Sequence, residues 1–151
     1  MRDEDIYEAN DNPDHHGGIR TAVKAWIEDP VAAKAKYGPI ASWDTSEITD
    51  MYELFRDKRD LNEDISRWCV SNVVDMDGMF NGATSFNGNL SGWNVGQVKS
   101  MVFMFSGATS FNGNLSGWNV GQVETMNCMF RDATSFNGNL SAWNVGQVES
   151  M

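Results

Sequence analysis

Large apolar residues recur along most of the chain at a fixed interval of 25 residues. Five columns keep this register, and they comprise Trp43, Trp68, Trp93, Trp118 and Trp143; Met51, Met76, Met101, Met126 and Met151; Phe55, Phe80, Phe105 and Phe130; Ile40, Ile65, Leu90, Leu115 and Leu140; and Ile48, Val73, Val98, Val123 and Val148. One unit cannot bury such an apolar face alone, so neighbouring units must stack. The pattern therefore predicts a tandem-repeat solenoid.

The first third of each unit has helical spacing. Met101, Met104, Phe105 and Ala108 stand at i, i+3, i+4 and i+7, which places them on one face of an α-helix. Ser100 precedes the first Met, and Asp, Ser or Thr holds the same position in the other units. These residue types favour the N-cap position. The spacing predicts a helix of about two turns that starts at each Met.

The last third of each unit predicts a short strand, because Trp93 and Val95 are two residues apart and share one face. A period of 25 also lies in the range of roughly 20–29 residues that leucine-rich repeats use. We therefore expect an α/β repeat solenoid of the leucine-rich-repeat type, with one short parallel strand and one short helix per unit. The Asn columns at Asn87 and Asn89 are expected to bond loop backbone from coil to coil.

The chain before the repeats predicts a separate helical element. Ile19, Val23, Trp26 and Ile27 have helical spacing, and Asp29-Pro30 is typical of an N-cap followed by a first helical residue. A second short helix over 31–37 then ends at Gly38. We expect residues 19–39 to form an N-terminal cap on the repeats of 40–151, and residues 1–18 to form a mobile acidic tail.

The unit Met-x-x-Met-Phe-x-x-Ala-x-Ser-Phe-Asn-x-Asn-Leu-Ser-x-Trp-Asn-Val-x-x-Val resembles the repeat of BspA-like leucine-rich-repeat surface proteins. More narrowly, it resembles the mycoplasma-lipoprotein-type 25-residue repeat of unknown function. The likeness extends over about residues 20–151, with Gly96, Gly121 and Gly146 where Ser is usual and Leu61 where other units have Phe. The resemblance implies a leucine-rich-repeat-like fold and, in many members, adhesion or recognition at the cell surface. It implies no catalytic residues.

Charge narrows the classes of partner. The formal net charge of −10 argues against nucleic acid and against an anionic membrane surface. No apolar run is long enough to span a bilayer, and no signal peptide is visible. Two free thiols, Cys69 and Cys128, favour a reducing compartment, whereas the resembled family is often found at the cell surface. The compartment therefore stays open.

The sequence offers few residues that could act in catalysis. His15 and His16 are the two histidines, and they adjoin each other in the expected tail. A Ser-His or Cys-His catalytic pair therefore has no partner within the repeats. The spacing of Cys and His matches no metal site, and no Gly-rich phosphate loop occurs. We expect no enzyme activity, no cofactor and no metal.

Two surfaces are candidate sites. The first is the outward face of the expected strands, which carries Arg67, Cys69, Asn94, Asn119 and Asn144. The second is the stacking surface of the last unit, which carries Phe136, Leu140, Trp143, Val145 and Val148 and which we expect to stay partly open to water. These features predict a non-catalytic protein-interaction or structural scaffold module, with a protein partner or second copy at the C-terminal end. The alternative is a module that binds carbohydrate or a surface, ice included.

Overall fold

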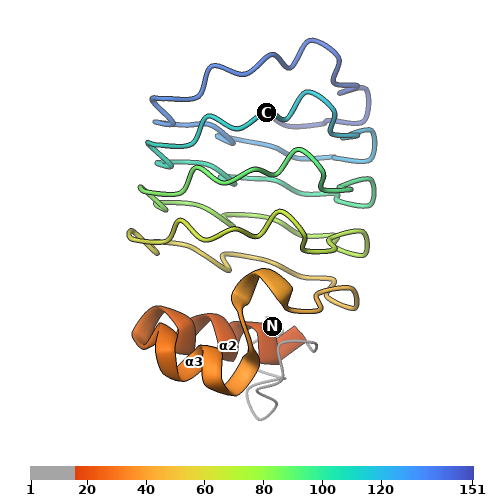
Figure 1. Ribbon diagram of the computed structural model, residues 1–151. Helices are drawn as coiled ribbons and strands as arrows, with labels where there is room; N and C mark the ends of the chain where they lie inside the picture. The colour runs from red at the N-terminus through yellow and green to blue at the C-terminus, as the bar shows by residue number, and fades with distance from the viewer. Residues whose placement is uncertain (1–15) are drawn as a thin grey trace.

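The computed structural model describes residues 16–151, which form two helices followed by a stack of coils (Figure 1). Helix α2 spans His16–Glu28, helix α3 spans Pro30–Tyr37, and a single 3-10 turn, η1, spans Ile40–Ser42. The rest of the described chain winds into coils that lie one above another, with one 25-residue unit per coil. The two helices lie against one end of the stack.

The helical prediction for the N-terminal element is confirmed. Ile19, Val23 and Trp26 of α2 are buried, as their spacing predicts. Asp29 caps α3 by accepting a hydrogen bond from the Ala32 N–H, Pro30 is the first helical residue, and Gly38 donates its N–H to the Lys34 carbonyl. Helix α2 begins at His16, so the expected start of the cap at residue 19 is three residues late. Residues 1–15 of the expected tail lie outside the described residues.

The expectation of an α/β repeat solenoid of the leucine-rich-repeat type is wrong. Residues 16–151 contain two α-helices before the repeats, and within the repeats they contain no α-helix and no strand. The segment from Met101 to Ala108 shows why. The N–H groups of Met101, Phe103, Phe105 and Gly107 donate to carbonyls of the next coil, at 2.7–2.9 Å. In an α-helix these N–H groups would instead donate to carbonyls four residues back in the same helix.

The remaining N–H groups of this segment close tight turns within the coil. Met104 donates to Met101, Ser106 to Phe103 and Ala108 to Phe105, each three residues back. Positive φ angles at Phe103 (58°) and Gly107 (70°) let alternate peptide groups point along the stack. The same apolar residues that suggested a helical face are buried, but turns carry them to the core.

The expected strand is also replaced by turns. Trp93 donates its N–H to the Leu90 carbonyl and Val98 donates to Val95. Parallel pairing is limited to one isolated bridge between successive coils, at Asp50–Asp75, Asp75–Ser100, Ser100–Thr125 and Thr125–Ser150. Ser100, expected to be an N-cap, instead lies on this line of bridges, where its hydroxyl bonds Asp77 Oδ1 and Thr125 Oγ1.

Aromatic columns fill the space inside the coils. Phe80 stacks on Phe105 with ring centroids 5.4 Å apart, and Trp93 stacks on Trp118 at 6.5 Å. Four of the Trp indoles also donate to a carbonyl 28 residues earlier, in the preceding coil, as Trp118 Nε1 does to Leu90 at 2.9 Å. The same bond joins Trp68 to Ile40, Trp93 to Ile65 and Trp143 to Leu115. The Trp column therefore ties the coils together by packing and by hydrogen bonds.

Asparagines join the coils on the outside. Asn112 donates its backbone N–H to the Asn87 side-chain oxygen at 2.8 Å, and Asn137 bonds Asn112 in the same way. This part of the expected coil-to-coil bonding is present. Asn89 differs, because its side chain accepts from the Ser91 N–H in its own turn.

Helix α2 closes the first coil with a polar contact and an aromatic one. Arg20 Nη1 donates to the Tyr52 carbonyl at 2.6 Å. The equivalent carbonyl of the next coil, at Asp77, accepts the N–H of Glu53. Trp26 packs edge-on against Trp43 with ring centroids 5.8 Å apart. Arg20 thus supplies the donor that a preceding coil would supply.

Candidate functional site

The face that carries Arg67, Cys69, Asn94, Asn119 and Asn144 is exposed to solvent. It lies along a row of turns rather than on strands. The side-chain oxygens of Asn94, Asn119 and Asn144 accept the N–H groups of Gly96, Gly121 and Gly146, each at 3.0 Å. Each Asn is therefore oriented by its own turn, with its amide NH2 left for other contacts. The role of this face stays a prediction.

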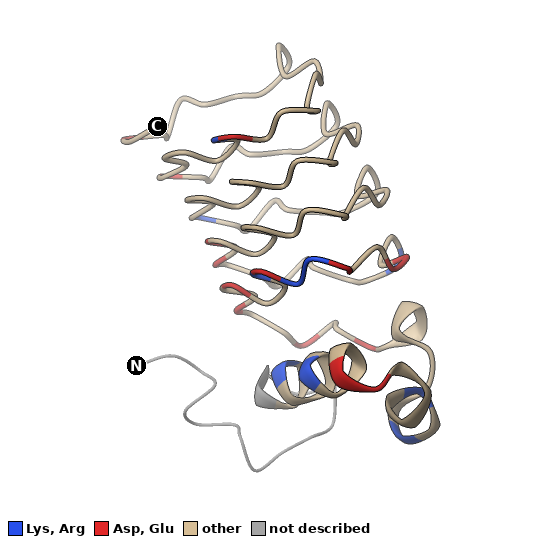
Figure 2. Ribbon diagram, turned by 90° about the vertical axis from the view of Figure 1, so that its left-hand side faces the viewer, with Lys and Arg blue, Asp and Glu red and all other residues tan. Residues whose placement is uncertain are grey.

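Charged side chains are unevenly distributed over the molecule. Figure 2 shows Lys, Arg, Asp and Glu gathered on the helices and the first coils, with few on the later coils. Asp44 and Asp64 lie at this charged end, where hydrogen bonds from the Ser46 and Ser66 side chains and backbones lower the pKa of each carboxyl. The side-chain hydrogen bond to Glu53 raises the pKa of Arg56. The later coils present a mostly uncharged polar surface.

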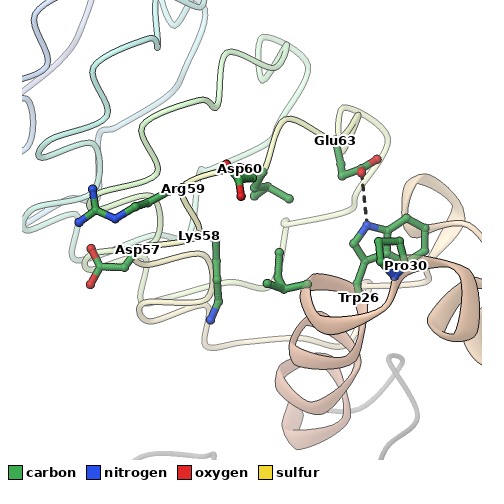
Figure 3. A pocket seen from close by; sticks show the side chains of 9 residues that line it. Trp26, Pro30, Asp57, Lys58, Arg59, Asp60 and Glu63 are labelled. Atoms are coloured by element: carbon green, nitrogen blue, oxygen red, sulfur yellow. Dashed lines mark hydrogen bonds between the residues drawn. The ribbon is translucent and has the colours of Figure 1, made fainter.

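A groove of about 440 Å³ lies between the helices and the first coil (Figure 3). Trp26 and Pro30 line it from the helices, and residues 57–61 and Glu63 line it from the coil. Trp26 Nε1 donates to Glu63 Oε1 at 3.3 Å across the groove. Among the described residues, Arg56 pairs with Glu53 and Asp57, whereas Lys58 and Arg59 form no ion pair.

The upper surface of the last coil is the second predicted site. Phe136, Leu140, Trp143 and Val148 are partly buried, and Val145 is 39% exposed. The equivalent residues one coil earlier, such as Phe111 and Trp118, are buried. A hollow of about 370 Å³ opens here, lined by Met126, Met129, Phe130, Leu140, Trp143, Val145 and Met151. The structure therefore brings three of the five predicted residues, Leu140, Trp143 and Val145, to one hollow, and Phe136 stacks on Phe130 beside it.

Backbone donors accompany this apolar surface, and sequence reasoning missed them. The N–H groups of Cys128, Phe130 and Asp132 have no acceptor among residues 16–151, although the equivalent groups of every inner coil donate to the next coil. Asn127 Oδ1 is buried and also lacks a partner. The helix prediction hid these groups, because it placed the N–H groups in bonds within one helix.

The repeats have a counterpart among known families. The profile of a family described as "Mycoplasma protein of unknown function, DUF285" matches residues 29–143. The chain belongs to this family. The DUF285 match begins at the N-cap of α3 and ends at Trp143, so it includes the coils and excludes α2. It confirms the mycoplasma-type repeat and does not extend to the BspA-like proteins. No curated protein and no solved structure matches the chain.

The DUF285 match assigns no chemistry, since the family is described as being of unknown function. Across residues 16–151, no three His, Cys, Asp or Glu side chains are grouped so that they could hold a metal ion. Neither helix of the described part has the length and apolar character that crossing a membrane requires. Three surface features of this DUF285 chain stand out: the groove, the Asn face and the open last coil.

Proposed function

We propose that the chain is a non-catalytic protein-interaction module, which serves as a structural scaffold in a larger assembly or a surface protein. The observation that carries the proposal is the open last coil. Val145 is 39% exposed there, whereas its equivalents Val95 and Val120 are each 1% exposed inside the stack. Apolar surface gathered in one place on an ordered scaffold is typical of a contact site for another protein.

The chemistry of this surface supports binding of a polypeptide. Ring faces of Phe130 and Trp143 supply apolar area, and aromatic anchors dominate the energy of many interfaces. The unpaired N–H groups of Cys128 and Phe130 supply directional donors, which backbone carbonyls of a partner can satisfy.

A carbohydrate- or surface-binding module is the second candidate. The regular column of Asn94, Asn119 and Asn144 favours it, because each amide is held in the same orientation at intervals of one coil. The resemblance to BspA-like surface proteins implies recognition of this kind as well. The aromatic rings that sugars commonly stack on are absent from this column, so the protein-interaction proposal is the better supported.

Two valine substitutions test the proposal. Val145→Glu places a charge on the open coil, whereas Val74→Glu places it at a site that is also 39% exposed. Val74 is a matched control because the equivalent residues of later units are Lys99, Glu124 and Glu149. Partners captured from the native source are purified, and their affinity is measured for the wild type and both variants. We expect Val145→Glu to weaken binding by at least about tenfold and Val74→Glu to leave it unchanged.

The second candidate predicts a different pattern. Replacing Asn94, Asn119 and Asn144 together by Asp keeps the turn acceptors but removes the amide donors. Binding to glycan arrays or to ice that is lost in this triple variant and kept in Val145→Glu would favour the carbohydrate- or surface-binding module. The same result without any purified protein partner would overturn the protein-interaction proposal.

A further inference from the structure

We infer that the open surface of the last coil binds a 25-residue coil of the same repeat pattern, stacked in the same chain direction. This inference rests on the proposed function, since it names the partner of that surface. Three kinds of group on the surface carry it: backbone donors, a buried acceptor and aromatic faces.

The backbone donors have the register of a missing coil. In the coil below, Phe103, Phe105 and Gly107 donate their N–H groups to the carbonyls of Asn127, Met129 and Arg131, at 2.7–2.9 Å. The equivalent donors of the last coil are Cys128, Phe130 and Asp132, which have no acceptor in the described chain. A ligand that satisfies all three must present carbonyls on alternate residues and on one side, as a repeat coil does.

A side-chain acceptor continues the same register. Asp77 Oδ1 accepts the N–H of Val102, which belongs to the next coil, at 2.7 Å. Asn127 stands 50 residues after Asp77, two units on, and its Oδ1 is buried without a partner. A buried polar atom without a partner is costly, so a coil that offers an N–H at this position would relieve the cost. The Asn column of Asn87, Asn112 and Asn137 supports the same conclusion. Asn112 Oδ1 accepts the N–H of Asn137, so Asn137 Oδ1 is the acceptor that the equivalent N–H of a further coil would use.

The exposed aromatic rings determine which side chains a bound coil must carry. Phe130, Phe136 and Trp143 each stack on a ring of the coil below, with centroids 5.6, 6.0 and 6.5 Å apart. Their upper faces meet the open surface. Two Phe and one Trp at the repeat spacing would continue these columns. The indole N–H of that Trp would donate to the Leu140 carbonyl, as Trp143 Nε1 donates to the Leu115 carbonyl.

A second copy of this chain fits the surface poorly. Two copies placed end to end about a twofold axis would set N–H donors against N–H donors. A head-to-tail copy would have to present the lower side of its first coil, but α2 covers that side, and Arg20 already donates to the Tyr52 carbonyl. The ligand is therefore a repeat coil whose carbonyl side is uncovered.

Hydrogen exchange of the 151-residue protein tests the inference. The probe is a synthetic peptide with the sequence of residues 102–125. Met151 holds the same position in its unit as Met101, so this peptide begins at the repeat position that comes next after Met151. The control peptide has Met104, Phe105 and Phe111 replaced by Ser. We expect the first peptide to slow exchange at Cys128, Phe130 and Asp132 by at least about tenfold and the control peptide to have no effect.

A covalent extension removes the dependence on peptide affinity. The chain is lengthened after Met151 by the same 24 residues, or by the Ser-substituted version. The first extension should protect the same three amides and raise the unfolding midpoint, and the second should do neither. The inference is overturned if both extensions leave the amides equally unprotected, or if the 151-residue chain alone protects them as it self-associates with rising concentration. Either result leaves the proposed function standing if Val145→Glu still abolishes binding of the native partner.

Discussion

At the residue scale, the backbone of each coil depends on positions where φ is positive. The seventh residue of the units, counted from the Met, is Asp57, Gly82, Gly107 or Asp132, with φ between 57° and 75°. Gly and Asp tolerate this left-handed region better than most residues. Gly and Asp both have low helix propensity, so their presence at this position in every unit was a signal against the helix.

Gly82→Ala tests this requirement. Gly82 has φ 75°, and an added Cβ would also clash with Asp57 Oδ1. We expect a loss of about 1–2 kcal/mol in the free energy of unfolding, measured with denaturant, from the left-handed backbone alone. The control is Gly92→Ala, because an added Cβ there meets nothing within 4 Å and Ala142 holds the same position. Equal losses at the two sites would contradict the turn geometry.

The hydroxyl of Ser46 is expected to control the ionisation of Asp44. Ser46 donates both its hydroxyl, at 2.6 Å, and its N–H, at 3.0 Å, to Asp44 Oδ1, and these bonds lower the pKa of Asp44. Ser46→Ala removes the larger contribution, so the pKa of Asp44 should rise toward its ordinary value while the pKa of Asp64 stays low. NMR titration of the two carboxyl groups measures this.

The sign of the linked pH effect follows from the lowered pKa. The stabilisation from the Asp44 hydrogen bonds is present above the unfolded pKa of about 3.9 and is lost as the pH falls through the lower folded pKa. An Asp44 pKa that does not change in Ser46→Ala would contradict this role of the hydroxyl and would leave the Ser46 N–H as the hydrogen bond that lowers the pKa.

At the scale of the element, apolar spacing identified which residues are buried but not the backbone that buries them. Met101, Met104, Phe105 and Ala108 are all fully buried. A series of turns with positive φ at Phe103 and Gly107 produces the same spacing as a helical face. The two structures differ in where the N–H groups donate, and periodicity carries no information on that. By contrast, α3 was predictable because Asp29, Pro30 and Gly38 are specific end signals.

A comparison of two substitutions at Phe103 distinguishes a turn from a helix. Phe103→Ala and Phe103→Gly remove the same side-chain contacts, so their difference reports the backbone. At φ 58° the Gly variant should be more stable than the Ala variant by about 1 kcal/mol. In a helix the order would be reversed by a similar amount. Denaturant unfolding of the two variants gives the sign, and a more stable Ala variant would argue for a helix.

At the scale of the whole molecule, the candidate site was only half visible in the sequence. The apolar residues of the last coil could be named from the repeat register, because a column residue without a following unit lacks one neighbour. The donors of Cys128, Phe130 and Asp132 could not be named, since they follow from turns that the spacing did not reveal. The groove beside Trp26 was missed for a related reason, because it depends on how α2 is placed against the first coil.

The stack should also be less stable toward its open end. Trp118 is 3% exposed and has a ring on each side, at Trp93 and Trp143, whereas Trp143 is only partly buried and has one Trp neighbour. Trp118→Ala should cost roughly 3–5 kcal/mol, as for other buried aromatic residues. Trp143→Ala should cost less, about 1–2 kcal/mol, because less apolar area leaves contact with the protein.

Denaturant unfolding and hydrogen exchange measure this gradient together. In stacked repeats each unit is stabilised mainly by its neighbours, so the coil with one neighbour should open first. The N–H of Phe105, which donates to Met129, should exchange more slowly than the N–H of Phe130. Equal costs for the two Trp substitutions, with equal exchange at Phe105 and Phe130, would mean that the last coil is as firmly held as the inner ones. Its open surface would then need no partner to be stable, and the case for a contact site there would lose its energetic basis.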